Sequence, residues 1–184
     1  MGIYPVSFTE ALEQLLVIFQ TGGDPDSMSG IVILHQRMPR SLAVIAVGAG
    51  LAVAGAVMQA LIHNPLVDPY VTGVSSGASF GVMLVTLSGL VTTSFATLWL
   101  VPVAGIIGAL VAFTVTMVVA EAAGGKAMSY VLGGTIIGLG LSAGTTLIMS
   151  FSADKMHSVT AWMFGSFANI EWSEALIVVL FVFC

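Results

Sequence analysis

The feature that most constrains this chain is a long run without charge. Residues 69–120, between Asp68 and Glu121, contain no Asp, Glu, Lys or Arg. A run of this length is too long for one membrane-spanning helix of about 20 residues and suits two helices joined by a turn. Strands of a membrane barrel alternate polar and apolar residues in short segments, so a continuous apolar run indicates helices.

The composition excludes most other protein classes. Only 7% of the 184 residues are charged, 58% are hydrophobic, and the mean hydropathy is +1.08. Soluble domains carry about 25% charged residues, so these few could not cover a soluble surface. A single cysteine, Cys184, excludes a disulfide scaffold, and a net charge of −5 argues against nucleic-acid binding. We therefore expect an all-α integral membrane protein, a polytopic bundle of transmembrane helices.

Charge-free segments predict five spans. We expect them at about residues 41–62, 71–90, 98–120, 128–150 and 173–184, with the turn between the second and third at Thr92, Thr93 and Ser94. The apolar part of the last span, residues 175–184, would form only about 15 Å of helix against a hydrocarbon core of about 30 Å, so we expect a truncated span there. Glycines four residues apart, such as Gly73, Gly77 and Gly81, favour close packing of helices in lipid.

Residues 1–40 differ from the rest of the chain. Ser7 and Glu10 have the spacing of a capping box. The apolar residues that follow fall on one helical face: Phe8, Leu12, Leu15, Leu16 and Phe19. Because this segment is too short and too polar to span a membrane, we expect an amphipathic helix at the interface. An exposed loop is expected over Gly22–Gly30.

Two polar clusters flank the first span. In the first, Arg37-Met38-Pro39-Arg40, the proline is suited to start a helix. Its arginines are either anchors at the membrane interface or a docking point for acidic groups on a partner, since Arg pairs with carboxylate in bidentate fashion.

The second cluster is His63-Asn64-Pro65-Leu66-Val67-Asp68-Pro69. Its two prolines force a turn between spans, and Asn64 and Asp68 can bond to nearby backbone, so Asn64, Pro65, Asp68 and Pro69 are predicted to be a structural turn. Gln59 lies one turn earlier, where an amide within the bilayer needs a partner.

Signatures of enzymes are scarce. The three histidines, His35, His63 and His157, have no metal-binding or catalytic spacing, and the sequence has no phosphate-binding loop and no nucleophile elbow. We therefore expect neither catalysis nor a metal site nor a cofactor bound by this chain.

Taken together, the motifs resemble a known family. Arg37-Met38-Pro39-Arg40 is followed by Gly48, Gly55 and Gln59, then by the Asn64–Pro69 turn and Gly73-Val74-Ser75-Ser76-Gly77-Ala78. This order is similar to that in the FecCD-type permease subunits of bacterial and archaeal ABC importers for iron chelates, haem and cobalamin. Trp162-Met163-Phe164-Gly165-Ser166 resembles a later motif of that family, and Gly133-Gly134 lies where its fifth span would be.

The resemblance implies a fold and a set of partners. Residues 1–184 would be part of one transmembrane domain of the type II ABC importer permease fold, holding about five of its ten spans. The partners would be a second permease copy, identical or a close paralogue, two ATP-binding cassette subunits that use the ATP, and a periplasmic or lipid-anchored substrate-binding protein. The location would be the cytoplasmic membrane of a prokaryote.

The resemblance also assigns roles to residues. Arg37 and Arg40 would dock the substrate-binding protein on the outer face. The translocation path and its gate would include the residues Gln59, Ser75, Ser76, Gly124, Gly125, Thr135 and Gly138. Transport would proceed by alternating access.

The substrate expected from the resemblance is a ferric siderophore or similar iron chelate. Haem or cobalamin is the alternative within the same class. A structural membrane protein or a remnant that does not transport is the alternative from another class, because it too would lack enzyme motifs.

Charge alone suggests the opposite topology. If the spans alternate, Arg37, Arg40 and Lys155 share one side and Lys126 faces the other. The positive-inside rule would then place the arginines in the cytoplasm, whereas the resemblance places them outside.

Thiol labelling decides between these topologies. A cysteine at position 37, in intact cells and with Cys184 replaced, is expected to react with a membrane-impermeant reagent from outside. Labelling only after lysis would place the arginines in the cytoplasm and remove their docking role.

Overall fold

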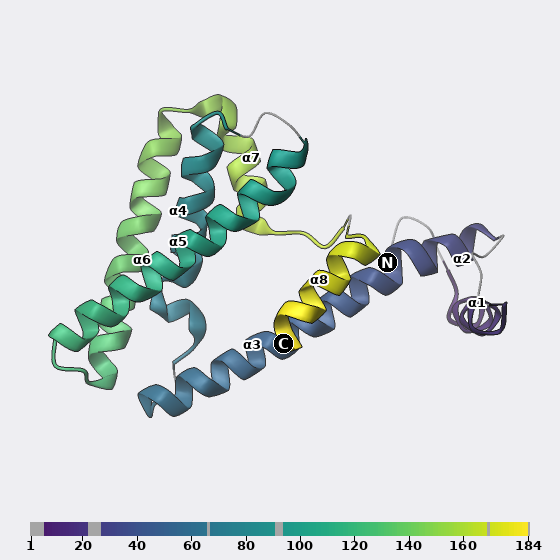
Figure 1. Cartoon of the computed structure of the whole chain (residues 1–184), viewed down its shortest axis with the longest axis horizontal. Helices are drawn as coiled ribbons and strands as arrows, with labels where there is room; N and C mark the ends of the chain where they lie inside the picture. Colours follow the sequence, from purple (N-terminus) through teal and green to yellow (C-terminus); the bar gives the residue numbers. More distant parts are fainter. Residues whose placement is uncertain (1–5, 22–26, 66, 91–93, 169, 184) are drawn as a thin grey trace. The chain divides into compact units, whose positions relative to one another are not determined.

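The computed structural model describes residues 6–21, 27–65, 67–90, 94–168 and 170–183. Most of these residues are helical and none of them is in a strand, which confirms the all-α class (Figure 1). The helices are α1 (Phe8–Thr21), α2 (Met28–Val32), α3 (Met38–Ile62), α4 (Val74–Leu87), α5 (Ser94–Ala122), α6 (Ala127–Ser150), α7 (Ala153–Phe164) and α8 (Trp172–Phe183). Two short segments complete the set, a π-helical segment at Ile33–Arg37 and a 3-10 segment at Pro69–Thr72.

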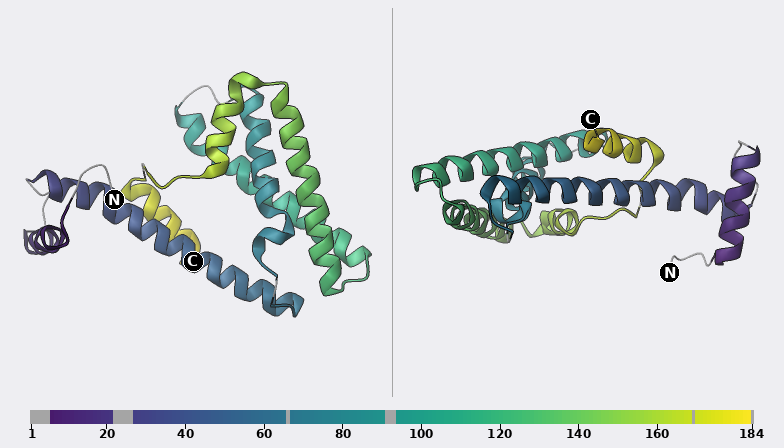
Figure 2. Two further views of the ribbon diagram at one scale, coloured as in Figure 1. Left: turned by 180° about the vertical axis from the view of Figure 1, so that it is seen from behind. Right: turned by 90° about the horizontal axis from the view of Figure 1, so that it is seen from below.

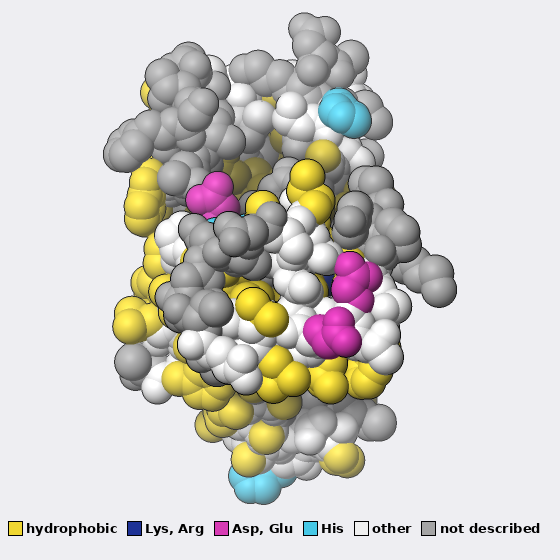
Figure 3. Space-filling model, turned by 90° about the vertical axis from the view of Figure 1, so that its right-hand side faces the viewer, with side chains coloured by type: hydrophobic (Ala, Val, Ile, Leu, Met, Phe, Trp, Pro, Cys, Tyr) yellow, Lys and Arg dark blue, Asp and Glu magenta, His cyan; other side chains and the backbone are white. Residues whose placement is uncertain are grey.

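Three helical stretches are long and apolar enough to cross a membrane: Met28–Ile62, Trp99–Ala122 and Ala127–Ser150. Large apolar side chains on them are exposed, for example Ile45 at 68% and Ile136 at 69%. On the face shown in Figure 3, apolar side chains are spread widely and acidic ones are few. Such a surface suits lipid or other apolar helices better than water.

The second predicted span is shorter in the structure than residues 71–90. Helix α4 has 14 residues, which amounts to about 21 Å of helix. A 3-10 segment precedes it, and Gly73 separates the two with a left-handed backbone, at φ 79°. Since the left-handed conformation breaks the run of α-helical hydrogen bonds, the helix cannot start at residue 71. Of the turn predicted at 92–94, Ser94 begins α5 and the other two residues lie outside the described part.

The start of the first long helix was predicted wrongly. The chain is already helical at Met28 and continues through the π-helical segment into α3, so Pro39 lies inside a helix. The exposed-loop prediction for Gly22–Gly30 is also wrong at its end, because Ser29 and Gly30 are buried; residues 22–26 lie outside the described part. The cause is Ser27, whose hydroxyl accepts the N–H of Gly30 at 3.1 Å and caps α2.

The chain divides into two compact units, described here one at a time. The first unit contains residues 1–52 and 166–184. In it, Ser7 Oγ accepts the N–H of Glu10 at 3.2 Å, which confirms the cap predicted for α1. Ser27 Oγ donates to Gln14 Oε1 at 2.6 Å and joins α1 to the start of α2.

Helix α8 packs along the helical stretch that runs from the π-helical segment into α3 within this unit. Trp172 contacts Leu34 at one end, and Val182 lies against Gly50 at the other. From the first contact to the second, the residue numbers increase on both helices, so the two helices run in the same direction. That is the relation expected if three spans lie between them in sequence.

The second unit, residues 53–165, holds α4, α5 and α6 side by side (Figure 2). Helices α4 and α5 cross in opposite directions, with Gly77 against Gly108 and Gly81 against Ala104. A Cβ at Gly108 would overlap the carbonyl of Gly77, so the two backbones touch. The predicted role of the small residues in close packing is therefore seen at this crossing.

Helix α6 joins the pair through backbone contacts of its own. A Cβ at Gly134 would overlap the carbonyl of Val71. From α5, the buried Thr116 Oγ1 donates to the carbonyl of Thr72 at 2.9 Å. Both contacts fall on the 3-10 segment, which therefore holds the start of α4 against its two neighbours.

We predict that Gly108→Ala destabilises the protein by about 1–3 kcal/mol, because the added methyl group would force α4 and α5 apart. Gly140→Ala is the matched control: nothing lies within 4 Å of a Cβ at this helical position, so Ala should be neutral or slightly stabilising. Thermal unfolding of the purified protein in detergent measures both. Equal melting temperatures for the two variants would contradict the backbone contact.

Candidate functional site

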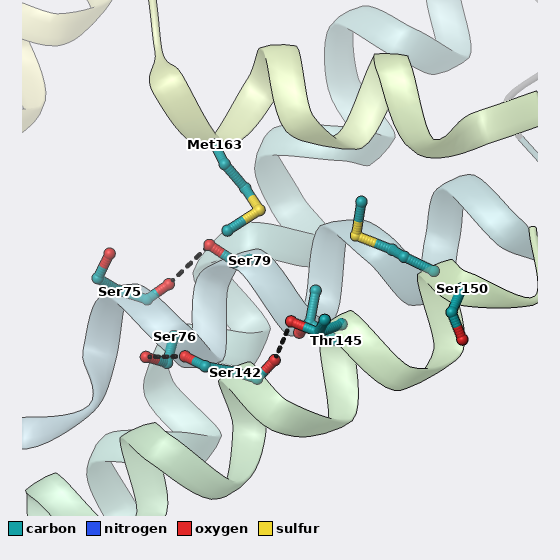
Figure 4. A pocket seen from close by; sticks show the side chains of 9 residues that line it. Ser75, Ser76, Ser79, Ser142, Thr145, Ser150 and Met163 are labelled. Carbon is teal, nitrogen blue, oxygen red and sulfur yellow. Dashed lines mark hydrogen bonds between the residues drawn. The ribbon is translucent and has the colours of Figure 1, made fainter. Parts of the chain in front are cut away.

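A hollow lined by hydroxyl groups lies between α4, α6 and α7 in the second unit, with a volume of about 540 Å³ (Figure 4). Its lining residues are Ser75, Ser76, Ser79, Ser142, Thr145, Thr146, Met149, Ser150 and Met163. Because α4 and α6 run in the same direction and touch through small residues, their hydroxyl-bearing faces meet.

The hydroxyl groups in the hollow donate hydrogen bonds to oxygen atoms of nearby residues. Ser142 Oγ donates to Ser76 Oγ at 3.1 Å, which ties α6 to α4. Ser79 donates to the carbonyl of Ser75 at 3.0 Å, and Thr146 to that of Ser142 at 3.0 Å. A hydroxyl that donates in this way keeps lone pairs for accepting, so the lining offers weak, uncharged acceptors to a molecule that enters.

The chemistry available in the hollow is limited. Its lining contains no Asp, Glu, His, Lys or Arg. Among the described residues as a whole, no group of three or more His, Cys, Asp or Glu could hold a metal ion. The arrangement is thus fit for brief contact with a polar molecule rather than for acid–base catalysis or metal binding.

The hollow includes some of the predicted path residues. Ser75 and Ser76 both line it. Gly138 lies beside them, since a Cβ there would be 3.5 Å from Ser76 Oγ. Thr135 and Gln59 do not belong to the lining: Thr135 donates to the carbonyl of Val131 at 2.7 Å, and Gln59 Nε2 donates to that of Pro65 at 3.1 Å. Gln59 therefore has the partner that its amide requires.

Gly124 and Gly125, the predicted gate glycines, end α5. The N–H of Gly125 donates to Ala120 O and that of Gly124 to Glu121 O, both at 3.0 Å. This pair of bonds is the Schellman motif, which needs a left-handed residue such as Gly124, at φ 100°. The structure thus gives these glycines a capping role at the turn; a gating role stays a prediction.

The predicted structural turn is built around Asp68. Its Oδ1 accepts the N–H groups of Tyr70 at 2.8 Å and Val71 at 2.9 Å, so it caps the 3-10 segment that begins at Pro69. The carbonyl of Asn64 accepts the N–H of Val67 at 3.3 Å, and Pro65 provides the acceptor for Gln59. These contacts lie within the segment for which the sequence predicts a structural turn.

The predicted docking arginines lie in the first unit. Arg37 is the last residue of the π-helical segment and is half-buried, whereas Arg40 lies in the first turn of α3 and is exposed. The structure thus brings Ser75 and Ser76 together in one site, and describes the arginine pair as a separate feature.

Sequence reasoning missed most of the α6 side of the hollow. Ser142, Thr145, Thr146 and Ser150 recur at intervals that fall on one helical face, which could have been noticed. Met163 could not have been found in this way, because only the fold brings α7 back to α4.

The chain matches the FecCD transport family over residues 1–184. The chain belongs to the FecCD transport family. Two relatives are similar to it along most of its length. Both are named vitamin B12 import system permease protein BtuC, one from Photorhabdus laumondii and one from Salmonella arizonae.

The two relatives are much longer than this FecCD-family chain. The Photorhabdus protein is 41% identical over 153 residues, covering 81% of this chain and 44% of the relative. The Salmonella protein is 36% identical over 171 residues, covering 88% of this chain and 50% of the relative. The chain therefore spans about half the length of the curated relatives it matches.

A solved structure is similar as well. It is described as the inward-facing conformation of a protein assigned as a metal-chelate type ABC transporter. The TM-score is 0.68 at 26% identity, over 91% of this chain and 56% of the other. Together with the long apolar helices, this likeness identifies the FecCD-family chain as a multi-pass membrane protein with the fold of an ABC transporter permease.

We predict that Asp68→Ala destabilises the protein by about 1 kcal/mol, because two backbone N–H groups lose their acceptor. Asp68→Asn keeps a side-chain oxygen and should retain most of the stability. Thermal unfolding in detergent measures both variants. Equal losses for Ala and Asn would mean that the cap contributes nothing and that only the charge matters.

Proposed function

We propose that this chain is part of the permease subunit of an ABC importer that carries a bulky metal chelate across the cytoplasmic membrane of a prokaryote. One observation carries the proposal: the family match extends over residues 1–184. Since the chain spans about half of its relatives, the activity is proposed for the longer protein to which such a segment corresponds.

The hollow between α4, α6 and α7 supports a passage role. A permease must let its cargo through without holding it tightly, and an uncharged lining of hydroxyl and thioether groups provides only weak contacts. The permease would change between outward-facing and inward-facing states, and ATP used by a separate subunit would supply the energy. That subunit would bind the two states of the permease with different affinity. In this proposal the chain itself binds no cofactor.

For the cargo, cobalamin is the better-supported candidate. Relatives that are 36–41% identical are named vitamin B12 import permeases. A ferric siderophore, the substrate expected from the sequence, remains a prediction. Uptake of radiolabelled cyanocobalamin and of a radiolabelled ferric siderophore into vesicles with the complete importer separates the two.

The proposed partners are a second permease copy, two ATP-binding cassette subunits and a substrate-binding protein on the outer face. Arg37 and Arg40 would receive acidic groups of the binding protein. The two arginines are three positions apart in a continuous helical stretch, so their guanidinium groups can lie near each other. Two adjacent positive groups would match a pair of carboxylates on the partner.

We predict that Arg37→Glu with Arg40→Glu abolishes uptake in the complete importer, because like charges would then face each other at the docking surface. Binding of the purified substrate-binding protein to permease vesicles should fall at least tenfold, while the amount of permease in the membrane stays normal. The charge-conserving pair Arg37→Lys with Arg40→Lys should lose less affinity, since only bidentate pairing is removed. Uptake that is unchanged by the double Glu variant would remove the docking role.

A further inference from the structure

The π-helical segment before Pro39 leaves one backbone carbonyl without its usual donor. In an α-helix the carbonyl of Leu34 would accept the N–H of Met38. Here the N–H of Met38 donates to Ile33 instead, one residue further back. The next residue, Pro39, has no N–H to offer. Neither residue that could close the helical turn therefore donates to Leu34 O.

Pro39 also explains why the helix is widened at this point. Within an α-helix, the ring of a proline collides with the carbonyl four residues before it, here that of His35. A π-helical turn adds about one residue to the turn and moves that carbonyl away, so the proline can stay inside a continuous helix. Pro39 is almost fully buried, and packing therefore holds the ring in place.

Trp172 supplies the missing donor. Its indole Nε1–H donates to the carbonyl of Leu34 at 2.8 Å, a contact between residues 138 positions apart in the chain. Trp172 begins α8, and both partners belong to the first unit. A buried or half-buried carbonyl without a donor raises the free energy of the folded protein. This bond therefore stabilises the widened turn relative to other helical geometries at the same position.

We propose that Trp172 is a positioning residue for the docking arginines: by donating to Leu34 O it holds the π-helical turn that ends at Arg37, and so sets the direction of Arg37 relative to Arg40. This inference rests on the docking role proposed above. Arg37 belongs to the widened turn, whereas Arg40 lies in the regular helix after it. A one-residue change in the register of that turn would therefore rotate Arg37 by about 100° relative to Arg40. The two guanidinium groups would then no longer face the same pair of carboxylates.

Arginine-selective labelling tests the proposal without any binding partner. Arg37 and Arg40 are the only arginines in this sequence, so phenylglyoxal modifies these two guanidinium groups and mass spectrometry of the peptides separates them. In the folded protein, Trp172→Phe should raise the labelling rate at the half-buried Arg37 relative to Arg40. The expected increase is about three- to tenfold, which is the size of effect that the loss of one hydrogen bond produces. A rate ratio that does not change would overturn the proposal.

Pro39→Ala makes the test specific. Alanine at this position restores an N–H and removes the ring, so the Leu34 carbonyl finds a donor within the helix. In the Pro39→Ala background, Trp172→Phe should therefore no longer alter the labelling ratio. An equal effect in both backgrounds would show that the indole acts by packing alone and would also overturn the proposal. Trp162→Phe, which changes an indole packed near Gly105, is the matched control and should leave the ratio unchanged.

A spectroscopic measurement covers the case in which Trp172→Phe fails to fold. With the other indoles replaced by Phe, the ultraviolet resonance Raman spectrum of Trp172 in the protein with Pro39 should show a hydrogen-bonded indole. The spectrum of a free indole would overturn the proposal. Failure of the docking role is recognised separately: the labelling ratio would respond to Trp172→Phe as expected, while charge reversal at the arginines would leave uptake unchanged.

Discussion

Inside a bilayer no water is available for the backbone, and each unpaired N–H or C=O costs several kcal/mol. Backbone groups are also paired at the places where this chain interrupts a helix. Asp68 accepts two N–H groups at the start of the 3-10 segment, and Thr116 donates to the carbonyl of Thr72. At the widened turn before Pro39, the indole of Trp172 donates to the carbonyl of Leu34.

Close contact between helices follows from the same absence of water. Because lipid is as apolar as the helices themselves, association depends on packing and on hydrogen bonds between them. Gly77 and Gly108 let the backbones of α4 and α5 touch, and this crossing, together with the contact of Gly134 with the 3-10 segment, brings the hydroxyl groups of α4 and α6 together. The lining of the hollow is therefore a consequence of where the small residues lie.

The functional features differ in kind between the two units. The second unit has a hollow with uncharged acceptors, which suits passage of a cargo that is bound only briefly. The first unit presents the arginine pair on a helix whose turn is held by a residue from α8. The proposed function would assign recognition by charge to the first unit and passage without charge to the second. The two roles are compatible, because a charged group inside a transport path would hold the cargo or be costly in lipid.

The sequence by itself determined the class of the protein. Charge-free runs and the scarcity of charge require apolar helices, and the ordered motifs from Arg37 to Ala78 point to the family that the comparison then confirmed. Asp68 and the prolines predicted the turn because capping and missing N–H groups are local effects. Where contacts between distant residues determine the structure, sequence patterns did not predict it. The helical start at Met28, the short α4, the α6 side of the hollow and the bond from Trp172 to Leu34 depend on tertiary packing, which no local pattern records.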